Sequence, residues 1–199
     1  LVAGVGSGKT LSFMLPPLIL AKRDIIDGNR DYGAHLFLYP RKALALDQFS
    51  KSLKPYSKAA GIPLKYVHSE MGKHYRSLPP KSVYKGIRSV HTSHTKPRLI
   101  ISSMETLKNR ISHPIIVKNL LSRVQTITMD EVHLQSGVTG AQTAMLMRRI
   151  GNLCGNDTTW IGASATIAKP EEHLGRLMGI DSERIKLIEP LNNELEIDG

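Results

Sequence analysis

The residues with the clearest chemical capacity stand at the start of the chain, where Ala3 to Thr10 read Ala-Gly-Val-Gly-Ser-Gly-Lys-Thr. Glycines let successive backbone N–H groups turn inward around phosphate oxygens, and the N-terminus of the helix that follows adds a favourable field. A lysine supplies positive charge to the β and γ phosphates, and a threonine hydroxyl can bind Mg²⁺. The pattern therefore predicts a loop that binds the phosphates of a nucleotide together with Mg²⁺, made of Gly4, Val5, Gly6, Ser7, Gly8, Lys9 and Thr10.

A pair of carboxylates follows the apolar run Val124 to Met129, within the sequence Asp-Glu-Val-His at residues 130–133. Open α/β sheets bind ligands at the carboxyl ends of their strands, which is where this pair would lie. Asp130 is suited to hold Mg²⁺, and Glu131 is suited to orient and deprotonate the attacking water. Taken alone, such a pair more often marks a helix start or a surface position. The upstream loop favours catalytic roles for Lys9, Asp130 and Glu131.

Two hydroxyls follow another short apolar run, Thr159 to Gly162, in the sequence Ala-Ser-Ala-Thr at residues 163–166. Ser164 and Thr166 could hydrogen-bond the carboxylate loop, with His133 as a partner. They would then connect the state of the nucleotide to a polymer-binding surface. A plain turn is the alternative, because a Ser-Ala-Thr triplet carries little information without its context.

Apolar runs alternate with helical patterns along the chain, which is the order of elements in a parallel α/β sheet. The runs that predict strands are His35 to Tyr39, Leu64 to Val67, Leu99 to Ile101, Val124 to Met129, Thr159 to Gly162 and Ile185 to Ile188. The last of these, with Leu177 to Ile180 before it, would close the sheet. The helical patterns are Lys9 to Ala21, Lys42 to Ala60, Met104 to Arg110 and Thr139 to Leu153. Pro16 and Pro17 interrupt the first helical pattern, so we expect that helix to kink or end there.

The composition favours one globular domain with a polyanionic partner. A chain of 199 residues with 41% hydrophobic content can bury a sizeable core. The net charge of +10 favours phosphates as partners, although an ordinary basic surface is an equal alternative. The segment Lys65 to Arg98 holds eight Lys or Arg residues and only one acidic residue, Glu70. It is either a solvated loop or an insertion that faces nucleic acid.

The chain carries features of an intracellular protein without a membrane span. A single cysteine, Cys154, cannot form an internal disulfide and fits a reducing compartment. No run of about 18 apolar residues occurs, and the first residues lack the basic start of a signal peptide. We expect a cytoplasmic (bacterial) or otherwise intracellular location. Leu1 to Gly4 look like the end of a strand, so we expect residues 1–199 to be one domain that is truncated at its N-terminus.

In order along the chain, the three motifs resemble those of superfamily 2 helicases of the DEAD/DEAH-box type. The resemblance implies a RecA-like P-loop domain, α/β, with a mainly parallel sheet and helices on both faces. Tyr39 to Gln48 look like motif Ia of that family, and Ile101 to Leu107 occupy the place of motif Ib. In the family these motifs touch the sugar-phosphate backbone, which carries no sequence preference. The positions implicated are Arg41, Lys42, Ser102, Ser103 and Thr106.

The chain departs from the family pattern at three places. Ala3 replaces the first glycine of the loop, Ser102 and Ser103 replace the usual Thr-Asn or Thr-Pro, and His133 stands where RNA-directed DEAD-box proteins have Asp. The histidine favours DNA over RNA. Motif Ia, the segment His133 to Gln142 and Leu146 to Arg149 are similar to the branch that includes RecQ-like repair helicases and the helicase subunits of anti-phage systems such as DISARM.

The resemblance implies an ATP-driven DNA helicase or translocase, of which this chain is the first motor domain. An ATPase switch or remodeller that does not separate strands is the alternative. A binding module with a degenerate ATP site is a third possibility, against which the intact Lys9, Asp130 and Glu131 argue. In the family a second RecA-like domain completes the ATP site with arginines, and it is absent from this chain. We therefore expect that domain and further subunits as partners, and weak nucleotide binding by the isolated module.

Overall fold

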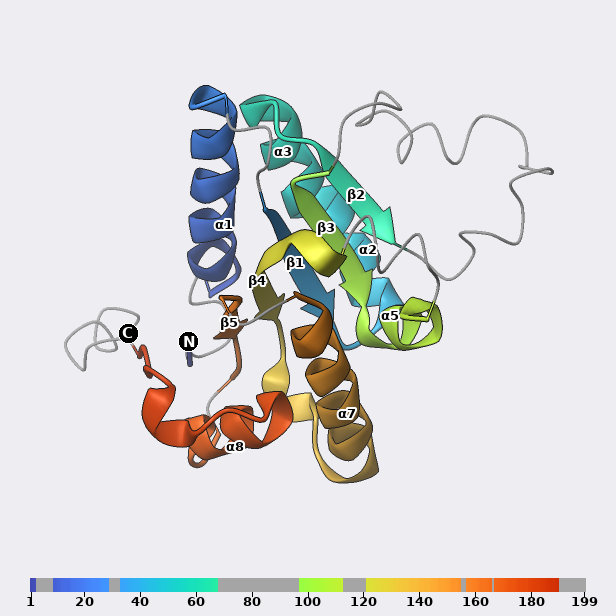
Figure 1. The fold of residues 1–199 in the computed structure, drawn as a ribbon, viewed down its shortest axis with the longest axis vertical. Coiled ribbons are helices and arrows are strands. Elements are labelled where there is room, and N and C mark those ends of the chain that lie inside the picture. The colour runs from blue at the N-terminus through green and yellow to red at the C-terminus, as the bar shows by residue number, and fades with distance from the viewer. Residues whose placement is uncertain are drawn as a thin grey trace, which may run out of the picture.

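A five-stranded sheet forms the centre of the molecule (Figure 1). The computed structural model describes residues 1–2, 9–28, 33–67, 97–112, 121–154, 157–165 and 167–189. The strand order is β2-β3-β1-β4-β5, and every neighbouring pair is parallel. The carboxyl ends of all five strands therefore meet at one edge of the sheet. The strands are β1 (Ala34–Tyr39), β2 (Leu64–Val67), β3 (Leu99–Ser103), β4 (Val124–Met129) and β5 (Thr159–Gly162).

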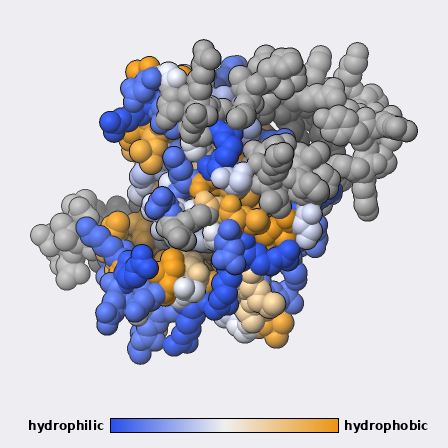
Figure 2. Space-filling view, viewed as in Figure 1, coloured by the Kyte–Doolittle hydropathy of each residue, from blue (hydrophilic) through white to orange (hydrophobic). Residues whose placement is uncertain are grey.

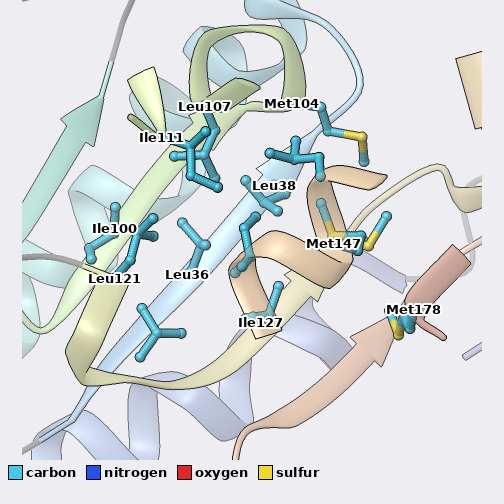
Figure 3. Close-up of a cluster of buried hydrophobic side chains, with 14 of the residues drawn as sticks. Leu36, Leu38, Ile100, Met104, Leu107, Ile111, Leu121, Ile127, Met147 and Met178 are labelled. Carbon is cyan, nitrogen blue, oxygen red and sulfur yellow. The ribbon is translucent and has the colours of Figure 1, made fainter. Parts of the chain in front are cut away.

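Helices cover both faces of the sheet, as predicted for the α/β class, and the described surface in Figure 2 carries both hydrophilic and hydrophobic residues. Successive side chains of a strand point to opposite faces, so Leu36 and Leu38 of β1 join one core cluster and Phe37 and Tyr39 join the other. The first cluster, shown in Figure 3, packs against α5 (Met104–Arg110), α7 (Gly137–Cys154) and α8 (Pro170–Met178). The second packs against α1 (Lys9–Ile26), α2 (Lys42–Gln48) and the segment that leads to α3 (Lys54–Ala60). Both faces of β1 are therefore buried.

The helix α1 continues past its two prolines, so of the predicted kink or end, an end at these residues is wrong. Pro16 and Pro17 lie inside an 18-residue helix that continues to Ile26. A proline in a helix interior costs about 3 kcal/mol because a backbone hydrogen bond is lost. Phe13, Met14 and Leu18 are buried on the same helix, and each such side chain contributes about 1.5–3 kcal/mol. Packing on the sheet therefore outweighs the local penalty.

The helical pattern predicted for Lys42 to Ala60 contains a π-helical segment, η1 (Phe49–Leu53), between α2 and α3. The buried positions Ala45, Phe49, Leu53 and Ser57 recur every four residues, whereas an α-helix repeats every 3.6. The wider turn of a π-helix keeps these side chains facing the sheet.

The C-terminal part of the described chain differs from its prediction. Leu177 and Met178 lie in α8, a helix that the apolar pattern did not reveal, and residues 185–189 form no regular strand. The carbonyl of Ile188 accepts a hydrogen bond from the Val2 N–H at 3.0 Å, and Val2 forms one isolated bridge with Ser164. These are single contacts and not the ladder of hydrogen bonds that defines a strand.

Two predictions about composition meet the structure only in part. Cys154 is half-buried, and burial raises the pKa of its thiol to about 12, which fits a structural role. Most of the basic segment Lys65 to Arg98 lies outside the described residues. Across the described ranges, no helix has both the length and the apolar composition that a membrane span requires.

Candidate active site

The loop after β4 places a buried carboxylate at the carboxyl edge of the sheet. The Asp130 N–H donates to the carbonyl of Leu38 in the central strand at 3.0 Å, and the residue is only 6% exposed. Burial raises the pKa of Asp130 to about 6, although the Glu131 N–H donates to its Oδ1 at 2.8 Å and the nearby charge of Lys9 acts in the opposite direction. A buried carboxylate of this kind gains free energy when a cation binds it.

Glu131, the next residue, has a strained backbone. Its φ of 51° and ψ of 47° are left-handed, a conformation that costs a residue other than glycine about 1–3 kcal/mol. The following residue, Val132, is buried, and its N–H donates to the carbonyl of Ala163 at 3.0 Å. The surrounding structure therefore holds Glu131 in this conformation. Its side chain is about one-third exposed and lines a hollow.

This hollow has a volume of roughly 690 Å³, which is in the range of small-ligand sites. It brings together residues from the start of α1, the turn before α2, α2 itself, the loop after β4 and the segment after β5. These residues are Lys9, Pro40, Arg41, Ala43, Leu44, Asp47, Glu131, His133, Leu134 and Ala165. Three motifs that lie far apart in the sequence therefore meet around one space.

The described donors fit Mg²⁺ better than a metal that needs a cage of side chains. Within the described ranges, no group of three His, Cys, Asp or Glu residues could hold a metal ion. Mg²⁺ usually keeps several waters and takes one or two carboxylates together with the phosphates of its substrate. Asp130 offers such a carboxylate, and Thr10 lies half-buried in the first turn of α1. Gly4 to Gly8, the predicted phosphate cradle, lie outside the described residues.

His133 connects the second and third motifs. Its Nδ1 lies 3.2 Å from the Ser164 hydroxyl and 3.3 Å from Oε2 of Glu131. A protonated Nδ1 donates to the carboxylate, whereas an unprotonated Nδ1 accepts from the serine. The predicted contact between Ser164 and His133 is therefore present, and the two partners compete for one nitrogen. Thr166, the other predicted member of this relay, lies outside the described residues.

The five residues predicted to contact a nucleic-acid backbone divide into two groups. Arg41 and Lys42, at the start of α2, are exposed, and the Lys42 ammonium forms an ion pair with Glu105 at 3.2 Å. Three hydroxyl residues at the end of β3 and in the first turn of α5 are no more than 1% exposed: Ser102, Ser103 and Thr106.

The three buried hydroxyls bond within the protein. Ser102 donates to the carbonyl of Val67 at 2.9 Å. The Ser103 hydroxyl accepts from the Thr106 N–H at 3.2 Å and caps α5. In this conformation the three hydroxyls are occupied within the protein, and contact of Ser102, Ser103 and Thr106 with a nucleic acid stays a prediction. Their burial was not visible in the sequence.

Three further residues of the site were not predicted. The buried Tyr39 is the last residue of β1, and its hydroxyl has no hydrogen-bond partner among the described residues; burial, with the charge of Asp130, raises its pKa. Gln135 is buried and accepts from the Thr143 hydroxyl of α7 at 2.7 Å. His173 of α8 contacts the carbonyl of Val132 at 3.0 Å. The helix that carries His173 could have been found from Pro170 and the two acidic residues after it, which are typical of a helix start.

Comparison with known proteins gives one family and several relatives. The family model for DEAD/DEAH box helicases matches residues 1–174. The chain is 31% identical to the ATP-dependent helicase YprA of Bacillus subtilis over 187 residues, which cover 89% of this chain and 22% of YprA. It is 28% identical to the ATP-dependent helicase hrq1 of Schizosaccharomyces pombe, with 92% of this chain and 16% of the relative covered. The chain thus spans about a fifth of the length of these curated relatives.

Solved structures give the same fold. A crystal structure of the helicase MrfA bound to DNA superposes with a TM-score of 0.66 at 28% identity, and the match covers 95% of this chain and 24% of MrfA. The DEAD-box helicase Mss116 bound to single-stranded RNA has the same TM-score at 14% identity, covers 90% of this chain and 34% of Mss116, and supports the fold alone. The RecA-like architecture predicted from the motifs is therefore confirmed.

Proposed function

The chain belongs to the DEAD/DEAH box helicase family, and from this premise we propose that residues 1–199 are the first RecA-like domain of an ATP-driven helicase or translocase that acts on DNA. The observation that carries the proposal is the hollow at the carboxyl edge of the sheet, where Lys9, Glu131 and His133 meet. The relatives with 28–31% identity are ATP-dependent helicases by name, and MrfA is a helicase that binds DNA. They support both the reaction and the choice of DNA.

In the proposed mechanism, each residue of the hollow has a separate task. Lys9 binds the β and γ phosphates of ATP, and Asp130 with Thr10 would hold Mg²⁺. The ion, when bound, supplies charge neutralisation on the phosphate oxygens. Glu131 orients the attacking water and accepts its proton. The His133 ring lies between this carboxylate and the Ser164 hydroxyl, so a change in the charge of the carboxylate changes the hydrogen bond that His133 makes.

The proposal also includes a second RecA-like domain and a path for DNA. We expect the second domain to close over the hollow and to contribute arginines that stabilise the transition state. Of the five residues predicted to contact nucleic acid, Arg41 and Lys42 are exposed and suited to a DNA backbone. Mg²⁺ use, the DNA substrate, partner subunits, an intracellular location and a role in repair or phage defence stay predictions from the sequence.

Substitution of Lys9 tests the proposed ATP site. Lys9→Ala in the full-length protein should abolish ATP hydrolysis stimulated by single-stranded DNA, because the phosphates lose their positive partner. Lys58→Ala, an exposed lysine of α3, is the matched control and should leave turnover unchanged. Undiminished hydrolysis by the Lys9→Ala protein would show that the site is assigned wrongly.

A strand-displacement assay distinguishes the helicase from the alternative switch or remodeller. The wild-type full-length protein should separate a partial DNA duplex in the presence of ATP and Mg²⁺. If DNA stimulates ATP turnover while the duplex stays intact, the switch is the better description. If RNA stimulates turnover and DNA does not, the choice of DNA is wrong.

A further inference from the structure

Val132, which follows the catalytic glutamate, is fixed by three hydrogen bonds. Its N–H donates to the carbonyl of Ala163 at 3.0 Å. Its own carbonyl accepts from the Gln135 N–H at 3.0 Å and lies 3.0 Å from Nε2 of His173. A carbonyl oxygen can only accept, so this ring nitrogen must carry the proton and donate. Of these three hydrogen bonds, which anchor Val132, the one from His173 is the only one made by a side chain.

The anchors at Val132 bear directly on the backbone of Glu131. The peptide between the two residues is set by the ψ of Glu131, and that residue is left-handed with φ 51° and ψ 47°. Because this conformation is strained, a loop without anchors would relax toward an ordinary one and move the carboxylate. The geometry at Val132 therefore decides where the proposed catalytic base points.

The helix that carries His173 is itself seated on the strand that leads to the third motif. Leu174 packs so closely against Gly162, the last residue of β5, that a Cβ there would lie 2.6 Å from its Cδ1. Gly162 directly precedes Ala163, whose carbonyl holds Val132. One turn of α8 thus contacts the end of β5 through Leu174 and the loop after β4 through His173.

We propose that His173 is a positioning residue for ATP hydrolysis: its Nε2–H holds the Val132 carbonyl and thereby keeps Glu131 in the left-handed conformation that directs the carboxylate into the hollow. The inference rests on the proposed function and adds a residue outside the three motifs. It also predicts that hydrolysis and nucleotide binding respond differently. Lys9, the proposed phosphate ligand, lies on α1 and not on the loop after β4. The loss of His173 should therefore slow hydrolysis and leave nucleotide binding intact.

A matched pair of amides tests this role in the full-length protein. Gln places its amide nitrogen near the position of Nε2 and can still donate to Val132, whereas Asn is one carbon shorter and cannot reach it. His173→Asn should lower kcat about tenfold, equivalent to about 1.4 kcal/mol, with the Kd of a fluorescent non-hydrolysable ATP analogue changed less than about twofold. His173→Gln should retain at least about half of the wild-type kcat. Arg176→Leu, on the exposed side of the same helix, serves as the control and should match the wild type.

Each other outcome counts against the inference. If the Asn and Gln variants have equal kcat, the hydrogen bond has no role in hydrolysis. If the Asn variant loses analogue affinity and melting temperature together with kcat, His173 only supports the fold. A wild-type protein that hydrolyses no ATP would instead refute the proposed function, and the Lys9→Ala protein would then be indistinguishable from it.

Discussion

Two parts of the sheet edge, the loop after β4 and the end of β3, look alike in sequence and differ in structure. Each lies at the carboxyl end of a buried parallel strand and carries polar residues predicted to be functional. After β4, Glu131 and His133 are about one-third exposed and face the hollow, and the backbone is strained. At the end of β3, Ser102 and Ser103 are buried, and their hydroxyls bond within the protein. A polar residue at a strand end is thus a candidate for chemistry when its polar atoms remain available.

The largest expected effect tests the functional side of this contrast. Glu131→Gln should lower kcat for ATP hydrolysis by about 10²–10⁴, because the water loses its general base. Binding of a non-hydrolysable ATP analogue, measured by fluorescence titration, should be retained. Glu105→Gln makes the same change in the exposed first turn of α5 and should leave kcat unaltered. Equal losses of kcat in the two variants would show that the two strand ends do not differ in function.

The second effect concerns the buried charge of Asp130 and its dependence on pH. Burial raises its pKa from 3.8 to about 6, so the resulting stability is fully present below pH 3.8 and is lost as pH rises through about 6. At pH 8 without Mg²⁺, Asp130→Asn should therefore stabilise the protein, by up to about 3 kcal/mol at about 1.4 kcal/mol per pKa unit.

Thermal unfolding at pH 5 and pH 8 measures this difference. The Asn variant should melt above the wild type at pH 8, and the gap should narrow at pH 5. Addition of Mg²⁺ with an ATP analogue should stabilise the wild type far more than the variant. A gap that does not change with pH would mean that the carboxylate is not buried as described.

A smaller effect tests the structural side of the contrast. Ser103→Ala removes the cap of α5 and should lower the free energy of unfolding by about 1 kcal/mol. Affinity for single-stranded DNA should not change, because the hydroxyl is buried. Urea unfolding and fluorescence anisotropy measure the two quantities, with the exposed Ser50→Ala as control. A loss of DNA affinity without a loss of stability would restore the role first predicted for this serine.

The smallest stability effect is expected at Lys42, an exposed residue at the start of α2. Lys42→Ala breaks a solvent-exposed ion pair with Glu105, which is worth about 0–1 kcal/mol. It should nevertheless weaken DNA binding and reduce the salt dependence of the affinity by about one counterion. Anisotropy titrations at several salt concentrations give that slope. An unchanged slope would place Lys42 away from the DNA path, and Lys58→Ala provides the comparison for a lysine elsewhere on the surface.

Features encoded in short stretches were predicted well, and features that need distant contacts were not. Leu64–Val67, Val124–Met129 and Thr159–Gly162 were predicted with the bounds that the strands have, because a buried strand is an apolar run. The two prolines of α1 misled because the packing that offsets them comes from the sheet. The predicted strand Ile185 to Ile188 is not formed, because an apolar run alone does not show whether a partner strand lies beside it.

The candidate site shows the same division. The motifs predicted Lys9, Asp130 and Glu131 from residue types and their order along the chain. The burial of Ser103 and the contact of His173 depend on elements that meet only in three dimensions, and no local pattern reports them. Gly4 to Gly8 and Thr166 stay predictions because they lie outside the described residues.

The position of β1 in the centre of the sheet has a consequence for the order of events during folding. Its partner in β4 is distant along the chain, as His35 and Thr126, which share a hydrogen bond, are 91 residues apart. Pairings of such long sequence separation form slowly because a large loop must close first. A ribosome therefore releases an apolar β1 well before β4 exists to cover it. The edge that holds Asp130 is completed late. Until then we expect the nascent chain to need a chaperone that covers its apolar β1.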